Sequence, residues 1–165
     1  MDRVQSKWFN IVCEWVERNS FDQVPVFSTP ARKRDFEMLE SLWGVELPEE
    51  FVDFYSFSNG FGTRTEGDRS VDWLFVPIER LPQFTKFQRD FFYGSNPRVA
   101  CSFFPFIDFT PDAYGYYSDE SNVKTNDKLW YYEDALHCHL TLAPDYDWRY
   151  FLSERKGGIE DYLQR

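Results

Sequence analysis

The segment from Leu42 to Gly60 constrains the fold more than any other part of the sequence, because it predicts two helices joined by a short connector. Gly44 can end the first helix in a left-handed conformation that other residues resist. Pro48 suits the first turn of the second helix, where its missing N–H is not needed. Asn59 and Gly60 both tolerate a positive φ, so they predict the end of the second helix.

The second helix of this corner also has one strongly apolar face. Two glutamates fall in its first turn, where the helix dipole favours negative charge. Phe51, Phe54 and Tyr55 follow at positions i, i+3 and i+4, which lie on a single helix face. We expect this face to be buried, and we expect Leu47 to be buried at the corner itself.

Hydrophobic patterning outside the corner predicts further helices and a sheet. Trp8, Val12 and Trp15 share one face of an N-terminal helix, and residues 31–43 form the helix that precedes Gly44. Pro105 predicts a bulge or break, because proline cannot donate to a β-ladder. Aromatic and β-branched runs predict strands at Val71–Val76, Val99–Phe109, Tyr114–Tyr117 and Leu129–Tyr132, with a short last strand at Leu136–Leu142.

The connecting segments are less regular. Phe61–Ser70 is polar and contains glycines, which predicts a mobile loop, and Phe21–Pro30 predicts a loop or a short extended piece. Pro82–Tyr93 fits either a helix or an irregular aromatic segment. Apolar spacing over Trp148–Leu152 predicts a closing helix, and Ile159–Leu163 predicts a terminal turn or two.

The corner resembles the signature of the SUKH superfamily. That signature contains an amphipathic helix, a Leu-Gly-type break, Leu-Pro, an aromatic-rich helix and a closing Asn-Gly. The resemblance covers residues 31–152, and residues 1–30 form an N-terminal helical extension outside it. The matching residues here are Leu42, Gly44, Leu47, Pro48, Phe54, Tyr55, Asn59 and Gly60.

The resemblance implies an α+β fold, with helices packed on one side of a mostly antiparallel sheet. Many members of the superfamily are immunity proteins that neutralise a co-encoded bacterial toxin. Others include a fungal regulator of cell-wall synthesis. The resemblance therefore implies a protein-binding role, as an immunity protein or as a regulatory scaffold.

Aromatic residues are unusually frequent, with 18 Phe, 10 Tyr and 6 Trp among 165 residues. Such rings bury much area each, which favours a compact globule over disorder. A chain of this length can bury a core without disulfides or metal, so we expect one domain over residues 1–165. Tyr and Trp that reach the surface are common at protein interfaces.

The formal net charge is −10, from 28 acidic and 18 basic residues. This balance argues against a general nucleic-acid binder, which needs a basic footprint. It is compatible with a basic protein partner, because complementary charge speeds encounter. The simpler interpretation is that acidity keeps an aromatic-rich protein soluble.

The sequence gives weak signals for metal binding or catalysis. If His137, Cys138 and His139 lie on a strand, the two histidines share a face. A zinc ion is usually bound by four ligands, and no CxxC or second histidine pair completes such a set. Nothing supports a nucleophilic cysteine with a histidine in reach. We therefore expect no metal, no cofactor and no enzymatic activity.

Cysteine usage and hydropathy indicate the cellular compartment in which the protein is expected. Three widely spaced cysteines fit reduced thiols in a cytoplasmic protein. Charged residues interrupt the first twenty positions, so a secretory signal is not expected there. No apolar run approaches the length of a membrane span. We expect a cytoplasmic protein that does not contact a membrane.

Residues 112–120 combine tyrosines with carboxylates, a mixture that suits recognition of a basic protein. The alternative is that this segment is a strand whose aromatic rings lie in the protein core, followed by a turn that is exposed to solvent. The expected binding residues are Asp112, Tyr116, Tyr117, Asp119, Glu120 and Asp127.

Together these inferences predict a cytoplasmic immunity protein that binds a cognate toxin domain and blocks it sterically. The alternative is a non-catalytic scaffold in a signalling or cell-wall pathway. The identity of the toxin and the oligomeric state are left open by the sequence.

The prediction of no metal can be measured directly. Elemental analysis of the purified protein should find no stoichiometric zinc. Replacing the three cysteines by serine, or His137 and His139 by glutamine, should leave partner binding intact in whatever protein stays folded. One equivalent of tightly held zinc would contradict this prediction.

Overall fold

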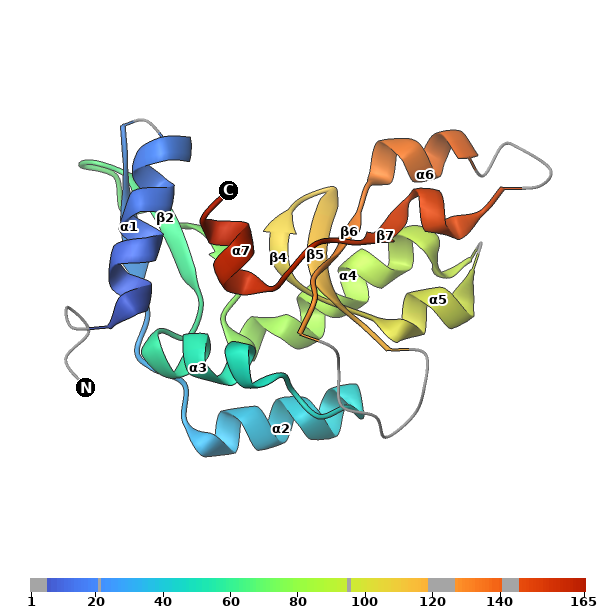
Figure 1. Cartoon of the computed structure of the whole chain (residues 1–165), viewed down its shortest axis with the longest axis horizontal. Coiled ribbons are helices and arrows are strands. Elements are labelled where there is room, and N and C mark those ends of the chain that lie inside the picture. Colours follow the sequence, from blue (N-terminus) through green and yellow to red (C-terminus); the bar gives the residue numbers. More distant parts are fainter. Residues whose placement is uncertain (1–5, 21, 95, 119–126, 141–145) are drawn as a thin grey trace.

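The computed structural model describes residues 6–20, 22–94, 96–118, 127–140 and 146–165. Within them, a seven-stranded antiparallel sheet has helices packed against it, which confirms the predicted α+β class (Figure 1). The strands are β1 (Gln23–Phe27), β2 (Phe61–Thr65), β3 (Asp72–Phe75), β4 (Phe103–Phe109), β5 (Asp112–Tyr117), β6 (Trp130–Tyr132) and β7 (Leu152–Glu154).

Seven α-helices and two 3-10 turns make up the other regular elements in the described part of the chain. The helices are α1 (Lys7–Asn19), α2 (Lys33–Trp43), α3 (Glu49–Phe57), α4 (Leu81–Tyr93), α5 (Pro97–Ser102), α6 (Asp134–Leu140) and α7 (Ile159–Leu163). The 3-10 turns are η2 (Ile78–Arg80) and η3 (Trp148–Tyr150).

The strands lie in the sheet in the order in which they occur in the chain, so β1 and β7 are its two edges. Every neighbouring pair is antiparallel. The register between β4 and β5 shifts between Pro105 and Ile107, which confirms the irregularity predicted from the proline.

The helical corner forms as its sequence predicts. Gly44 ends α2 with a φ of 70°, in the left-handed region. Pro48 immediately precedes α3 and takes the N-cap position. Leu47 is 4% exposed, so the connector between the helices is anchored in the core.

The closing Asn59-Gly60 pair fixes the exit of the chain from α3. Gly60 has a φ of 82°, and a Cβ atom there would collide with the carbonyl oxygen of Phe75. The Asn59 side chain accepts the Ile78 N–H at 2.9 Å and donates to Glu79 at 2.7 Å. This pair therefore ties the end of α3 to β3 and η2.

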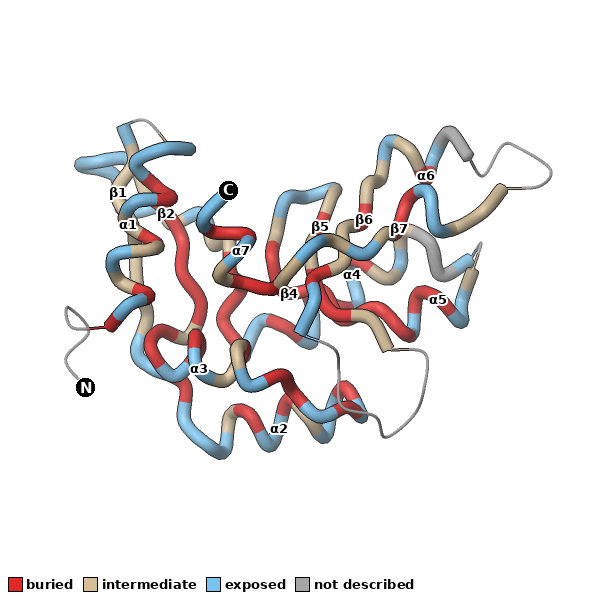
Figure 2. Tube along the Cα trace, viewed as in Figure 1, coloured by how far each residue is buried: buried red, intermediate tan, exposed pale blue. Residues whose placement is uncertain are grey.

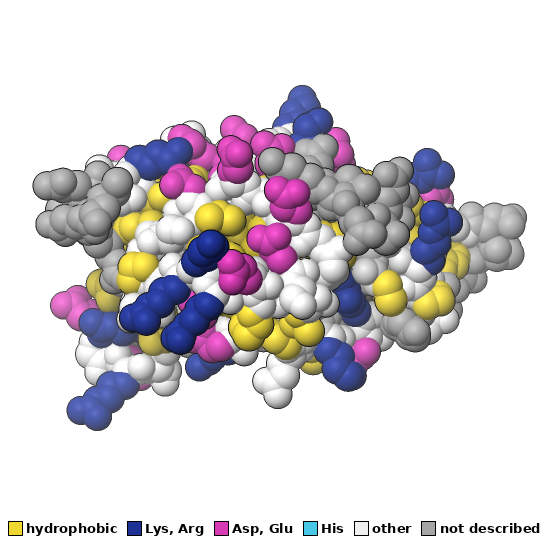
Figure 3. All heavy atoms as spheres, turned by 90° about the horizontal axis from the view of Figure 1, so that it is seen from below, with side chains coloured by type: hydrophobic (Ala, Val, Ile, Leu, Met, Phe, Trp, Pro, Cys, Tyr) yellow, Lys and Arg dark blue, Asp and Glu magenta, His cyan; other side chains and the backbone are white. Residues whose placement is uncertain are grey.

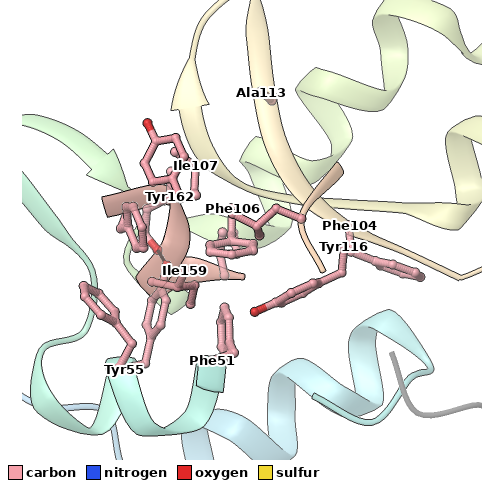
Figure 4. Close-up of a cluster of buried hydrophobic side chains, with 14 of the residues drawn as sticks. Phe51, Tyr55, Phe104, Phe106, Ile107, Ala113, Tyr116, Ile159 and Tyr162 are labelled. Atoms are coloured by element: carbon pink, nitrogen blue, oxygen red, sulfur yellow. Dashed lines mark hydrogen bonds between the residues drawn. The ribbon is translucent and has the colours of Figure 1, made fainter. Parts of the chain in front are cut away.

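The core is built around the apolar face of α3 (Figures 2 and 4). Phe51, Phe54 and Tyr55 have no exposed surface, and the rings of Phe51 and Tyr55 stack with centroids 4.2 Å apart. Phe51 meets Phe106 of β4 edge-on at 5.2 Å, and Phe54 lies 4.8 Å from Phe75 of β3. This packing fastens α3 onto the middle of the sheet.

Helices cover both faces of the sheet along β5 and β6, where the sequence predicted one covered side. Tyr114 and Tyr131 stack at 4.7 Å, and Tyr114 packs against Tyr162 of α7. Tyr132 lies next to Tyr131 in the strand, so it points to the other face, where it stacks on Phe91 of α4 at 6.3 Å.

The segment Phe61–Ser70, which the sequence predicted to be a mobile loop, contains strand β2. The glycines in this segment suggested a loop. Gly62 is instead required by strand packing, since a Cβ there would collide with the carbonyl oxygen of Asp72 in β3. Phe61 and Thr63 are buried on the paired strand.

Three further element predictions were wrong in type. The first part of Val99–Phe109 belongs to helix α5, and β4 begins only at Phe103. The predicted last strand at Leu136–Leu142 is helix α6 as far as Leu140, and the remaining two residues lie outside the described residues. The predicted helix at Trp148–Leu152 is one 3-10 turn followed by β7, because pairing with β6 overrides the local apolar spacing.

Helices α1 and α7, from the two ends of the chain, pack against each other (Figure 1). Trp15 stacks on Tyr162 at 6.3 Å, and Arg18 donates to the carbonyl oxygen of Leu163 at 2.7 Å. On the surface, Lys7 and Glu160 form an ion pair at 3.1 Å. The N-terminal extension is thereby joined to the C-terminal helix.

The central position of Phe54 gives a stability prediction. Phe54→Ala should lower the free energy of unfolding by about 3–5 kcal/mol, because it removes a fully buried ring. Urea denaturation measures this loss. The matched control, Met38→Ala, truncates a side chain that is 51% exposed and should change stability by less than about 0.5 kcal/mol. An unchanged midpoint in Phe54→Ala would contradict the assignment of this ring to the core.

Candidate protein-binding surfaces

The structure puts the residues of the predicted binding surface in different environments. Tyr116 has no exposed surface, and its ring packs 4.9 Å from Phe106 and 6.1 Å from Phe51 (Figure 4). Burial raises the pKa of its hydroxyl well above the ordinary value. A buried ring cannot anchor a partner, so Tyr116 is part of the core.

Asp112 is a helix cap. Its Oδ1 accepts the N–H of Asp134, the first residue of α6, at 2.9 Å, and its Oδ2 accepts the Tyr131 hydroxyl at 2.6 Å. A carboxylate at a helix N-terminus also interacts favourably with the helix dipole. Both oxygens of the half-buried Asp112 therefore hold β5, β6 and α6 together.

Tyr117 belongs to a partly exposed stack of rings, which we call the aromatic ladder: Tyr117, Trp130 and Trp148. Tyr117 lies 4.5 Å from Trp130 and 5.5 Å from Trp148, with the rings nearly parallel. Asp127 is exposed just before β6. Asp119 and Glu120, the remaining predicted contacts, lie outside the described residues.

These predicted residues do not form one patch. Asp112 and Tyr117 stand at opposite ends of β5, roughly 17 Å apart at the usual rise of an extended strand. Because β5 and β6 are antiparallel, Asp127 lies toward the Tyr117 end. Of the six predicted residues, only Tyr117 and Asp127 are described at one end of the hairpin with side chains that solvent can reach.

A second surface, which the sequence reading missed, lies where α2 meets α3. Four carboxylates and no basic side chain line an open hollow there, beside Leu47, Val52 and Ser56. Figure 3 views this side of the molecule and shows several acidic side chains near its middle, with basic ones to either side of them. We call this hollow the acidic groove, and its carboxylates are Glu40, Glu46, Glu49 and Asp53.

The carboxylates of the groove are close enough to affect one another. Burial, and then the neighbouring charges of Glu46 and Glu37, raise the pKa of Glu40. Asp53 accepts the indole N–H of Trp8 at 2.9 Å, which fixes its position. The sequence of either helix alone does not reveal this cluster of carboxylates. The charges come together only when α2 and α3 pack against each other at their corner.

Glu50, beside the groove, faces inward and joins α3 to the C-terminal helix. Its carboxylate accepts the N–H groups of Ile159 and Glu160 at the start of α7. Burial raises the pKa of Glu50, while these two hydrogen bonds act in the opposite direction. Glu50 is therefore a structural residue, and its charge is not part of the exposed surface.

Comparison with known protein families tests the family resemblance that the α2–α3 corner suggested. The model of the SMI1 / KNR4 family (SUKH-1) matches residues 30–154. The chain belongs to this family. The predicted SUKH resemblance is thereby confirmed, and the match includes the α2–α3 corner and the sheet from β2 to β7, while β1 lies outside it. A search of curated proteins finds no match.

The SUKH-1 family includes toxin immunity proteins, and its members are generally non-catalytic immunity or regulatory proteins. Both α1 and α7 lie outside the matched range, and they pack against each other as described above. In the described residues of this SUKH-1 chain, no helix is long and apolar enough to cross a membrane.

The His137-Cys138-His139 segment lies on α6, so the geometry assumed for a strand does not apply. A helix does not put positions i and i+2 on one face, in contrast to a strand. Among the described residues, no three His, Cys, Asp or Glu side chains are grouped to hold a metal ion. The absence of zinc stays a prediction for elemental analysis.

His137 is a core residue in this SUKH-1 domain. It is 5% exposed, its Nδ1 lies 2.9 Å from the Tyr132 hydroxyl, and its ring packs 4.3 Å from Phe151. Burial lowers the pKa of His137, with the charge of Asp134 acting in the opposite direction. The folded state therefore favours the neutral ring.

This preference predicts a pH dependence of stability. The unfolded chain binds a proton at His137 near pH 6.5, above the pKa in the folded state, so stability falls as the pH drops from 7 toward 5. Urea midpoints across this range should fall less in His137→Gln than in wild type. The control Cys138→Ser, at an exposed neighbouring position, should keep the wild-type profile. Parallel profiles for wild type and His137→Gln would contradict the assignment.

Proposed function

We propose that this SUKH-1 domain is an immunity protein that binds a cognate toxin domain and blocks it sterically. The observation that carries the proposal is the family match over residues 30–154, since the family includes toxin immunity proteins. Steric blocking requires binding alone, in keeping with a family whose members are generally non-catalytic. The proposal includes action in the cytoplasm, in keeping with three cysteines that form no disulfide with one another in the structure.

The acidic groove is the surface that we propose for capture of the toxin. Four carboxylates on one hollow attract a basic surface, and their field adds to the net charge of −10. Met38 and Leu42, on the outer face of α2, are 51% and 55% exposed, so apolar contact area lies on the helix that carries Glu40. Charge would then speed encounter, while apolar contacts slow dissociation.

Tyr117 and Asp127 remain our alternative contact surface. The aromatic ladder offers half-buried rings of the kind that anchor interfaces, and Asp127 adds one exposed charge near it. The two surfaces are made by different elements, so substitutions can distinguish them.

The test takes the product of the neighbouring gene as the candidate toxin. Co-expression should protect cells from the toxin, and purified protein should bind the toxin domain. Reversing three charges of the acidic groove should slow association by about tenfold at low salt, with a smaller effect at high salt, where charges are screened. The three substitutions are Glu40→Lys, Glu46→Lys and Glu49→Lys.

A matched control makes the same change of net charge elsewhere. Glu14→Lys, Glu17→Lys and Glu66→Lys reverse three exposed charges on α1 and after β2, and should slow association much less. Equal slowing in both triple variants would mean that only net charge matters. Faster dissociation in Tyr117→Ala, with an unaffected groove variant, would move the contact to the hairpin. Failure of the wild-type chain to bind or protect would favour the regulatory scaffold.

A further inference from the structure

A small pocket lies between the end of α2 and helices α4 and α5, away from the acidic groove. Its volume is about 290 Å³, near the lower end for small-molecule sites. Its walls combine apolar and polar side chains from three helices. They include Leu42 and Trp43 of α2, Pro82, Thr85 and Arg89 of α4, and Cys101 of α5.

Three of these residues carry a buried hydrogen-bonding atom with no partner. The atoms are Nε1 of Trp43, Oγ1 of Thr85 and Nη2 of Arg89. Gln88, on the same helix α4, is fully buried, and neither its amide nitrogen nor its oxygen has a partner. Buried polar groups are normally satisfied, because leaving them unpaired is costly. Of the seven unpartnered buried side-chain atoms found in the described residues, three thus belong to residues that line the pocket and two to Gln88 on the same helix as Thr85 and Arg89.

Arg89 is the centre of this group. Its Nε donates to the carbonyl oxygen of Phe103 at 2.8 Å, and its guanidinium lies 4.9 Å from the centre of the Phe104 ring. The Trp43 ring packs 5.4 Å from the same Phe104. Phe104 therefore packs against both the cation and the indole, which keeps these two side chains next to each other.

Arg89 also has no counter-ion among the residues that the structure describes. The nearby carboxylate of Asp90 is already paired with Lys86, at 2.7 Å. Burial lowers the pKa of the Arg89 guanidinium, which reflects the cost of keeping this charge away from water. An anionic ligand would supply the missing charge and accept from the unpaired donors.

We propose that this pocket binds a small carboxylate ligand, with its charge on Arg89 and its apolar body against Leu42 and Pro82. The Trp43 indole N–H and the Thr85 hydroxyl are covered by neighbouring atoms in the structure, and rotation of these two side chains toward the ligand would give further hydrogen bonds to the carboxylate.

Lys86 and Asp90 also line the pocket, but they form an ion pair at 2.7 Å, so Arg89 supplies its net charge of one. One net positive charge beside apolar walls suits a monoanion better than a phosphate, which carries more charge. This site does not rest on the proposed function, since its cation, Arg89, is not part of the acidic groove, although Leu42 lines the pocket and also belongs to the apolar contact area proposed beside the groove.

The test follows the indole N–H signal of Trp43 by two-dimensional NMR, with Trp43→Phe to assign it. Benzoate and butyrate represent a free small acid, and N-acetylglutamate amide represents a carboxylate side chain of a protein. At least one of these probes should shift the signal saturably, and its neutral amide counterpart should not. The response of the free acids or of the glutamate derivative then distinguishes the two sources.

Substitutions test the role of the cation. Arg89→Met keeps an unbranched apolar stem and removes the charge, and should weaken binding by at least about tenfold. The matched control, Lys33→Met, removes an exposed cation of α2 that does not line the pocket and should change affinity by less than about threefold. If Arg89→Met does not fold, Thr85→Val replaces it, and loss of one hydrogen bond should weaken binding measurably.

Three results would overturn the proposal. The first is no saturable shift of the Trp43 signal with any of the carboxylates. The second is an equal response to carboxylates and to their amides, which would make the pocket merely apolar. The third is unchanged affinity in Arg89→Met, or in Thr85→Val where that variant takes its place.

Discussion

The aromatic face of α3 is the contact on which the rest of the fold depends. Phe54 meets Trp8 of α1 at 5.2 Å and Phe75 of β3 at 4.8 Å, while Phe51 meets Trp43 of α2 at 6.3 Å. The Tyr55 hydroxyl donates to the carbonyl oxygen of Val76 at 2.8 Å, which satisfies the one polar group on this face. One short helix therefore joins the other N-terminal helices to the centre of the sheet, and offset and edge-on rings give this contact specific geometry.

The parts of the fold that the sequence predicted are those with strong local signals. The α2–α3 corner is specified by Gly44, Pro48 and Gly60, whose backbone preferences act within a few residues. Strand β2 and helix α6 could not be predicted in the same way. Gly62 is tolerated because β3 lies close to it, and α6 begins where Asp112, far away in sequence, caps it. Tertiary contacts decide these elements, and they override propensity.

The same reason explains the mixed result at the predicted binding surface. Alternation along β5 separates Tyr116 from Tyr117, but it does not tell which of the two faces α3. The acidic groove was not predicted, because Glu40 and Glu49 come from different helices. The pocket at Arg89 was also hidden from the sequence, since Arg89 resembles any helical arginine until the described residues are seen to give it no counter-ion. Charge composition predicts a basic partner, which stays a prediction, while the location of a charged surface depends on packing.

The order of strands leaves the sheet with two open edges, and both are poor templates for aggregation. In β1, Pro25 sits opposite Thr63 and offers no N–H to an incoming strand, while Phe9 of α1 packs on Phe27 at 5.5 Å. At the other edge, β7 is three residues long and ends at Glu154, which pairs with Lys128 at 3.5 Å. A chain with 21% aromatic residues thus exposes little backbone for adding strands from other copies, which limits fibril-like association at high concentration.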